Sequence, residues 1–312
     1  MTNPNYLSIQ SVAITGGLGN LGTKLFRHLA GLGTMRRLVG LDVRPAAPDH
    51  AANLLAGIAH PPVLEFVTCD FADYQDRCWR DVIEQVDAVV HFAAQNPYPE
   101  ATWEEAAISL DMTLHIANAA VESKQTKRVV FATSNHVMGR YKDDPLWASI
   151  GPGELTTALP PSTGTLWHTG EQALDSTPYA TAKLMGERVC KAAAGLSQGN
   201  TTFACVRIGW CQPGENLPTT LSAAGTPTQT SAVPATVDAA DYARADRWFK
   251  EMWLSNRDFL QLFERAILID GGEWPTGYIL VNGMSNNRGM KWSLAETQRW
   301  LNYQPLDDVY QA

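Results

Sequence analysis

The amino-acid sequence predicts a doubly wound α/β fold, in which helices cover both faces of a parallel sheet. Two observations support this. Short apolar runs alternate with segments of helical periodicity from residue 12 to residue 208, and the first run leads into regularly spaced glycines. No polar linker separates two independent halves of the 312-residue chain. We therefore expect a Rossmann-type domain over residues 1–209 and a smaller C-terminal substrate-binding lobe over residues 210–312.

The first element is a strand that ends at Thr15 and is followed by a glycine turn and a helix. The turn has two residues between successive glycines, which are Gly16, Gly19 and Gly22. Glycine permits the sharp turn, the approach of a pyrophosphate to the backbone, and close packing of helix on sheet. The N–H groups of Asn20 and Leu21 lie where a helix N-terminus attracts phosphate. This pattern predicts a dinucleotide site.

The ends of the next two strands offer further cofactor contacts. The run 37–41 ends in Asp42, about 20 residues beyond the glycines, where a carboxylate accepts the ribose hydroxyls of NAD. That charge favours NAD over NADP, and the nearby Arg44 softens the preference. The run 64–69 leads into Asp70 and Phe71, which either hold adenine or begin the next helix, with Asp70 as its cap.

The later elements continue the alternation. We expect strands at 87–94, 128–134 and 201–208, and helices at 103–124, 179–194 and about 258–266. Small residues at the end of the run 87–94, Ala93 among them, leave room for a ribose or nicotinamide. Ligands of such sheets bind beyond the carboxyl ends of the strands. Two irregular insertions, 139–178 and 212–246, follow strand ends, and we expect them to cover the site as a lid.

Composition excludes several classes of protein. The net charge of −8 argues against nucleic acid and anionic membranes as partners, and no apolar run approaches the ~20 residues that span a bilayer. The five cysteines show no C-x-x-C and no clustering with histidine at metal-ligand spacing. We therefore expect a cytoplasmic protein with no metal site.

Three residues form a candidate catalytic group. Ser134 ends the strand 128–134, whereas Tyr179 and Lys183 lie four residues apart on one face of the next long helix. A lysine ammonium stabilises a nearby phenolate, so that tyrosine becomes a usable base. Ser134 would hold a substrate hydroxyl, Tyr179 would remove its proton, and carbon would deliver hydride to NAD.

The chain resembles the extended short-chain dehydrogenase/reductase family, also called the NAD-dependent epimerase/dehydratase family. The resemblance rests on T-G-G-L-G-N-L-G (15–22), Asp42, H-F-A-A (91–94), F-A-T-S-N-H-V-M-G (131–139) and Y-A-T-A-K (179–183). Within the family, V-R-I-G-W-C-Q-P (206–213) and W-L-S-N-R-D-F (253–259) look like the uronate dehydrogenases. This resemblance implies oxidation of a hexuronic acid at C1 to a lactone with NAD, and a homo-oligomer.

The resemblance also implies substrate contacts. These are Asn96, Asn135, His136 and an arginine for the acid group, at Arg247 or its rival Arg244. His136 is alternatively a satisfied core histidine. Arg207 is either a pocket cation or a structural partner of carboxylates at the sheet end.

The substrate end of the sequence departs from the family pattern. Ser109 replaces the usual asparagine, Trp210 replaces a small serine, and the segment between Ser134 and Tyr179 is longer than usual. We therefore expect the substrate to be an anionic hexose, either a hexuronate or sulfoquinovose. The rival functions are a nucleotide-sugar epimerase or dehydratase of the same family and an NAD sensor without turnover. Asn135 and His136 follow Ser134 where dehydratases have an acidic pair, and the intact catalytic group disfavours a sensor.

Overall fold

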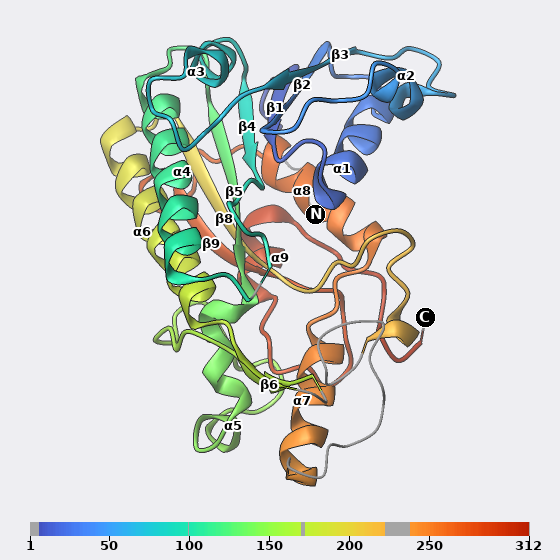
Figure 1. The fold of residues 1–312 in the computed structure, drawn as a ribbon, viewed down its shortest axis with the longest axis vertical. Coiled ribbons are helices and arrows are strands. Elements are labelled where there is room, and N and C mark those ends of the chain that lie inside the picture. The colour runs from blue at the N-terminus through green and yellow to red at the C-terminus, as the bar shows by residue number, and fades with distance from the viewer. Residues whose placement is uncertain (1–5, 99, 170–171, 222–237, 312) are drawn as a thin grey trace.

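A computed structural model describes residues 6–98, 100–169, 172–221 and 238–311 (Figure 1). Its centre is a seven-stranded parallel sheet in the order β3-β2-β1-β4-β5-β8-β9. The strands are β1 Ser11–Thr15, β2 Arg37–Asp42, β3 Val63–Thr68, β4 Ala88–His91, β5 Arg128–Ser134, β8 Thr202–Ile208 and β9 Tyr278–Gly283. The order reverses between β1 and β4, which is where a doubly wound sheet opens a crevice at its carboxyl edge. The predicted fold class is confirmed.

Apolar residues alternate between the two faces of this sheet. In β1, Val12 and Ile14 belong to one core and Ala13 to the other. In β5, Val130 and Phe131 divide in the same way. A strand buried on both faces reads as a continuous apolar run, and for this reason these strands were predictable.

Helices complete two layers around the sheet. One face packs against α3 Arg77–Ile83, α4 Trp103–Glu122 and α6 Thr177–Ser197; the other packs against α1 Asn20–Gly31 and α8 Asn256–Leu268. Helices α4 and α6 lie side by side on one flank of the molecule, and α1 and α8 lie on the opposite flank (Figure 1). The smaller helices are α2 His50–Leu55, near α1, and α9 Ala295–Leu301, against β9.

The chain after residue 209 contributes to the same sheet. Strand β9, which we did not expect, pairs with β8 from Phe203 and Tyr278 to Ile208 and Gly283. Helix α8, which the sequence predicted, covers the same sheet. The division at residue 209 stays a prediction, and much of the C-terminal part packs as the continuation of the first domain.

The insertion 139–178 holds several short elements. They are the end of η1 Asn135–Lys142, then α5 Leu146–Ser149, and the hairpin of β6 Leu166–His168 with β7 Ala173–Asp175. These lie with α7 Ala239–Glu251 at one end of the molecule (Figure 1). Two short 3-10 turns, η2 Pro218–Thr220 and η3 Pro275–Gly277, complete the elements. In the second insertion, 222–237 lie outside the described residues and α7 occupies 239–246, so the lid function stays a prediction.

None of the helices in the described ranges has the length and apolar character to cross a bilayer. All five cysteines are free thiols. The cytoplasmic location stays a prediction.

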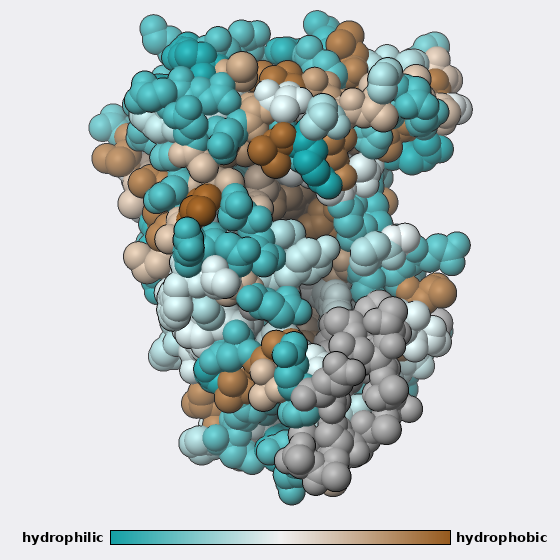
Figure 2. Space-filling model, in the orientation of Figure 1, coloured by the Kyte–Doolittle hydropathy of each residue, from teal (hydrophilic) through white to brown (hydrophobic). Residues whose placement is uncertain are grey.

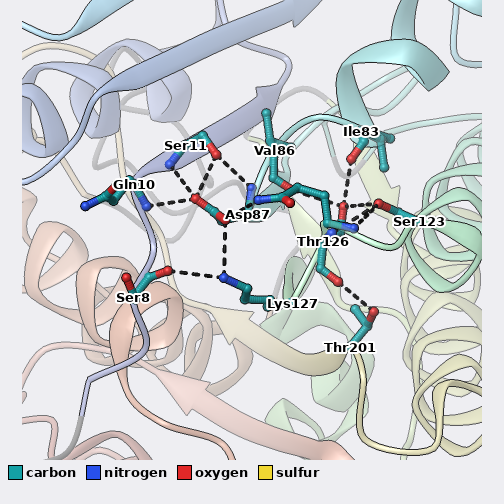
Figure 3. Close-up of polar contacts among 11 residues, drawn as sticks. Ser8, Gln10, Ser11, Ile83, Val86, Asp87, Ser123, Thr126, Lys127 and Thr201 are labelled. Atoms are coloured by element: carbon teal, nitrogen blue, oxygen red, sulfur yellow. Dashed lines mark hydrogen bonds and ion pairs between the residues drawn. The ribbon is translucent and has the colours of Figure 1, made fainter.

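A buried carboxylate joins the amino ends of three strands (Figure 3). Asp87, just before β4, accepts hydrogen bonds from the backbone N–H groups of Gln10 and Ser11 at 2.9 and 3.0 Å, and from the Ser11 hydroxyl at 2.8 Å. Gln125 donates to its other oxygen at 2.6 Å, and Lys127 lies 3.4 Å away. Burial acts to raise the pKa of Asp87, but these hydrogen bonds and Lys127 together hold it below its ordinary value.

We expect Asp87→Asn to lower the free energy of unfolding by about 1–3 kcal/mol at pH 7, because buried donors lose a charged acceptor. The lowered pKa means that the carboxylate stabilises the fold above its unfolded-state pKa of about 3.9, and that this contribution disappears as the pH falls through the native value. The difference between the two proteins should therefore shrink toward low pH in urea titrations. Asp111→Asn, on the exposed surface of α4, is the control. An equal loss in both variants would contradict the role of Asp87.

Candidate functional site

The glycine turn after β1 is built by close backbone contacts. Gly16 has φ +67°, and a Cβ there would lie 3.2 Å from the backbone nitrogen of Ala93. A Cβ on Gly22 would lie 2.7 Å from the Gly16 oxygen. Side chains are thus excluded at both positions, and the turn lies directly against the end of β4, as the prediction for Ala93 requires.

Helix α1 begins behind Gly19, which has extended geometry and no side chain with which to cap it. The first N–H groups of a helix, here those of Asn20, Leu21 and Gly22, have no intrahelical partner. Such a terminus fits the pyrophosphate of NAD. The side chain of Asn20 donates to the backbone oxygen of Cys211 at 3.0 Å, which ties the turn to the segment after β8.

Two residues near this turn were missed by the sequence analysis. The Thr15 hydroxyl accepts hydrogen bonds from the N–H groups of Phe92 and Ala93 at 3.1 and 3.0 Å, which holds the end of β4 against β1. The Lys24 ammonium donates to the Gln212 oxygen at 2.7 Å and to the Asn256 side chain at 2.6 Å. Both contacts join segments distant in sequence, so no local pattern could reveal them.

Asp42 lies at the carboxyl end of β2 and is 7% exposed. Its carboxylate accepts hydrogen bonds from the Leu18 N–H and from the backbone and guanidinium of Arg44. Burial acts to raise its pKa, but these bonds and the charge of Arg44 hold it below the ordinary value. The ribose-binding role of Asp42 stays a prediction.

The end of β3 differs from expectation. Asp70 is exposed and bonds the N–H of Ala72 at 2.8 Å, whereas Phe71 is 3% exposed and packs against Trp79. Helix α3 is capped by Asp76, which accepts from the N–H of Cys78. The helix-cap alternative for Asp70 is therefore wrong, because the residue that caps the helix, Asp76, lies six residues later. Contact of Asp70 and Phe71 with adenine stays a prediction.

Ser134 and Tyr179 meet at the carboxyl end of β5. Ser134 is the last residue of the strand, and its hydroxyl accepts a hydrogen bond from the N–H of His136 at 3.1 Å. It lies near enough to Tyr179, in the first turn of α6, to lower the pKa of that phenol. The Lys183 ammonium donates to the Ala132 oxygen at 2.9 Å and lies 5.7 Å from the centre of the Tyr179 ring. The three residues are thus brought together as predicted from their spacing.

Burial dominates the electrostatics of this group. It raises the pKa of Tyr179 to about 12, against a lowering by the nearby Ser134 hydroxyl, and it lowers the pKa of Lys183 to about 8. The expected lowering of the tyrosine pKa by the ammonium is therefore wrong for the protein alone, in which only Ser134 lowers it and burial prevails. Lys183 nevertheless keeps its proton at neutral pH.

A small cavity of about 10 Å³ lies beside this group. It is lined by Tyr179 and Lys183 and, from the segment after β4 and from α4, by Asn96, Ser109 and Thr113. Asn96 also donates to Glu105 at 3.2 Å. Figure 2 shows this face of the molecule hollowed near its middle, with apolar surface in its depth.

Asn135 and His136 follow Ser134 in η1. The amide of Asn135 donates to the Ile208 oxygen at 3.0 Å, and its own oxygen is buried without a partner in the described residues. The Nδ1 atom of His136 lies 2.8 Å from both the Thr165 and the Ser176 hydroxyls, and its ring stands edge-on to Tyr179 at 5.9 Å. Burial lowers the pKa of His136 to about 4, so its ring is neutral. It is both a hydrogen-bonded core histidine and a neighbour of the candidate base.

Arg207 is buried beneath α6. Its Nε and Nη2 atoms donate to the two oxygens of Glu187 at 2.8 Å each, and Glu187 also accepts from the Thr133 hydroxyl. Both side chains are nearly fully buried, so this pair faces the protein interior, and the Nη1 atom of Arg207 has no partner among the described residues. The structure therefore favours the structural alternative for Arg207, and we do not assign it to the substrate.

Arg244 and Arg247 lie on α7 and have different surroundings. Arg244 pairs with Asp144 and Asp241, and it lines a cavity of about 460 Å³ together with Lys142 and Trp167. Its Nε atom is buried and has no partner among the described residues. Arg247 is held by Glu251 at 2.5 Å and by the Gly289 oxygen at 2.9 Å. The described residues hold no group of three or more metal-ligating side chains.

The chain was compared with known proteins. Uronate dehydrogenase of Pseudomonas putida is 27% identical over 295 residues, which cover 94% of this chain and 83% of that protein. L-arabinose 1-dehydrogenase (NAD(P)(+)) of Haloferax volcanii is 26% identical over 301 residues, which cover 95% of this chain and 96% of the relative.

Solved structures show the same fold. A mutated uronate dehydrogenase superposes with a TM-score of 0.63 at 23% identity, covering 97% of this chain and 83% of the other. MoeE5 in complex with UDP-glucuronic acid and NAD gives 0.59 at 14% identity, covering 95% and 94%. The model of the NAD dependent epimerase/dehydratase family matches residues 12–209, so the chain belongs to that family and NAD is its cofactor.

Proposed function

We propose that this chain is an NAD-dependent sugar dehydrogenase that oxidises the anomeric C1 hydroxyl of an anionic hexose to the lactone. The observation that carries the proposal is the placement of Ser134, Tyr179 and Lys183 together at the sheet edge where the glycine turn fits NAD. The relatives named as dehydrogenases of uronates and of L-arabinose support a sugar substrate.

Ser134, Tyr179 and Lys183 have different roles in the proposed reaction. Ser134 holds the C1 hydroxyl, and Tyr179 removes its proton as general base. NAD supplies the acceptor for the hydride that leaves C1. Because burial raises the pKa of Tyr179 to about 12, the base needs positive charge nearby, and the protonated Lys183 contributes it. The neutral ring of His136 leaves the site without a competing imidazolium.

We expect Tyr179→Phe to lower the rate of NADH formation by about 10²- to 10⁴-fold, the usual contribution of a positioned general base. The affinity for NAD should stay unchanged, because the glycine turn and Asp42 are intact. Calorimetric titration with NAD and a spectrophotometric assay measure the two quantities. Tyr310→Phe, at a half-exposed position near the C-terminus, is the matched control. A Tyr179→Phe protein with retained turnover would refute the assignment of the base.

A panel of free sugars tests the function itself. Purified protein with NAD should form NADH with one anionic hexose among glucuronate, galacturonate and sulfoquinovose, and less with glucose or L-arabinose. Turnover of sulfoquinovose but not of the uronates would identify a sulfonate as the acid group. Turnover of a uronate but not of sulfoquinovose would exclude the sulfonate. If none of these sugars yields NADH although NAD still binds, the epimerase alternative is favoured, because an epimerase shows no net release of NADH.

We propose Arg244 rather than Arg247 for the acid group, since Arg244 lines the larger cavity and retains an unpartnered donor. Asn96 and Asn135 lie nearer the catalytic group and would bind sugar hydroxyls. With the preferred anionic sugar, Arg244→Gln should raise KM by about 10- to 100-fold, the cost of one charged hydrogen bond. Arg247→Gln, a matched change one turn along α7, should raise it little, and the opposite ranking would exchange the two assignments.

We also propose that the chain forms a homodimer through α4 and α6. Both helices expose large apolar side chains, with Leu114 49%, Met185 45% and Leu196 73% exposed. Light scattering of the unaltered protein should give twice the mass of one chain. The double variant Leu114→Lys, Met185→Lys should give the mass of one chain. The control Leu306→Lys, on the C-terminal segment, should keep the mass of the dimer. A monomeric unaltered protein would exclude the dimer.

A further inference from the structure

Helix α6 meets the end of strand β5 at three successive turns of one helix face. Tyr179, Lys183 and Glu187 are spaced four residues apart, so their side chains follow one another along that face. The Lys183 ammonium donates to the Ala132 oxygen at 2.9 Å, and Glu187 accepts from the Thr133 hydroxyl at 2.8 Å. Tyr179 lies near the catalytic serine, which is the next residue of the strand. Glu187 and the two catalytic residues of α6 therefore meet three consecutive residues of β5.

Glu187 also joins α6 to a second strand. Its two oxygens accept from Nε and Nη2 of Arg207 at 2.8 Å each, and the oxygen that accepts from Nε is the one that binds Thr133. Thr133 and Arg207 are paired residues of β5 and β8, so their side chains leave the same face of the sheet. The side chains of Glu187 and Arg207 are 2% and 1% exposed. A buried carboxylate with three donors from two strands holds the helix in one register on the sheet.

Gly186 sets how closely α6 approaches β5. A Cβ at this position would lie 2.7 Å from Cε1 of Phe131, a residue of β5. Phe131 is 1% exposed and its ring is stacked on that of His91, so it has little room to move away. The Lys183 ammonium lies 5.0 Å from the centre of the same ring. The absence of a side chain at Gly186 thus allows the close approach that brings the lysine over Phe131.

We propose that Gly186 and Glu187 are positioning residues, which together fix the distance and the register of α6 on β5. Through the helix they hold Tyr179 beside Ser134, and the Lys183 ammonium against the end of β5. This role rests on the proposed function, because it acts through the proposed base and its lysine. A misplacement of about 1 Å in a reacting group lowers a rate by about 10²-fold, so a small shift of α6 should reduce turnover in a protein that is still folded.

The distance is tested by Gly186→Ala, with Gly195→Ala as the matched control. Both glycines lie in α6, but a Cβ on Gly195 would meet no atom of the described residues within 4 Å. With the preferred sugar, Gly186→Ala should lower kcat by about 10- to 100-fold. It should leave KM within about 3-fold, because the change weakens an interaction of the transition state and not the binding of the sugar. Gly195→Ala should leave both constants unchanged.

The register is tested by removing the buried contacts of Glu187. Glu187→Met alone would leave the charge of Arg207 buried and unpaired, so the variant is the double change Glu187→Met, Arg207→Met, since apolar replacement of a buried pair is often neutral for stability. It should lower kcat as Gly186→Ala does. Thr133→Val, which leaves the pair intact and removes one donor, should lower kcat by about 3- to 10-fold, the worth of one hydrogen bond. A merely structural pair would give full kcat in each variant that thermal melting shows to be folded.

The titration of Lys183, followed by NMR of protein with labelled lysine, is a measurement that needs no sugar. Burial lowers the pKa of Lys183 to about 8, and Lys183→Met identifies its signal. If α6 shifts, water reaches the ammonium, so its pKa should rise toward the ordinary value in Gly186→Ala and in the double variant. It should stay unchanged in Gly195→Ala.

An unchanged Lys183 titration in Gly186→Ala or in the double variant would overturn the proposal. Full kcat in any of the three altered proteins would overturn it as well. If the unaltered protein oxidises no sugar, the proposed function fails, and the Lys183 titration still decides whether Gly186 and Glu187 position the helix. Failure of this inference is therefore distinct from failure of the proposed function.

Discussion

The contact between the glycine turn and the end of β4 is the constraint on which the site depends. A Cβ on Gly16, whose φ is positive, would press against the backbone of Ala93 at 3.2 Å, and the Thr15 hydroxyl accepts hydrogen bonds from the N–H groups of both Phe92 and Ala93. This contact fixes where α1 begins and where the chain leaves β4. The N–H groups at the start of α1, predicted to bind a pyrophosphate, and the small residues after β4, predicted to lie beside the nicotinamide, are therefore held in one relative geometry.

The same two strands are joined at their other end. Asp87 binds the backbone at Gln10 and Ser11, so β1 and β4 are held at both ends, by a carboxylate at one and by a hydroxyl at the other. Neither contact involves a residue with a proposed role in chemistry. A carboxylate with several backbone donors stabilises a fixed arrangement, because each buried donor would otherwise lose its partner. The crevice between β1 and β4 is thus held in place by groups that do not determine which substrate is bound.

The sequence allowed the cofactor end to be predicted because its signals are local. Gly16, Gly19 and Gly22 are regularly spaced, and Tyr179 and Lys183 share a helix face whatever packs around them. Other features depend on pairs distant in sequence. The pairing of Arg207 with Glu187 follows from the packing of α6 on β8. The apolar run at the start of β9, in which no strand was predicted, pairs with β8. The choice of Asp76 over Asp70 as the cap of α3 depends on which residue the turn after β3 places at the helix start.

The candidate substrate end differs from the cofactor end, because its side chains come from segments that are distant in the sequence. His136 follows Ser134 directly, yet its orientation is set by Thr165 and Ser176, which belong to the insertion before α6. The insertion is therefore part of the wall beside Tyr179 as well as a candidate cover. These contacts tie the orientation of the imidazole to the insertion, whereas Ser134 and Tyr179 are positioned by β5 and α6. Fold and catalytic group alone therefore do not identify the substrate in such a family, and the insertion is the part of the chain that we propose to contribute to substrate choice.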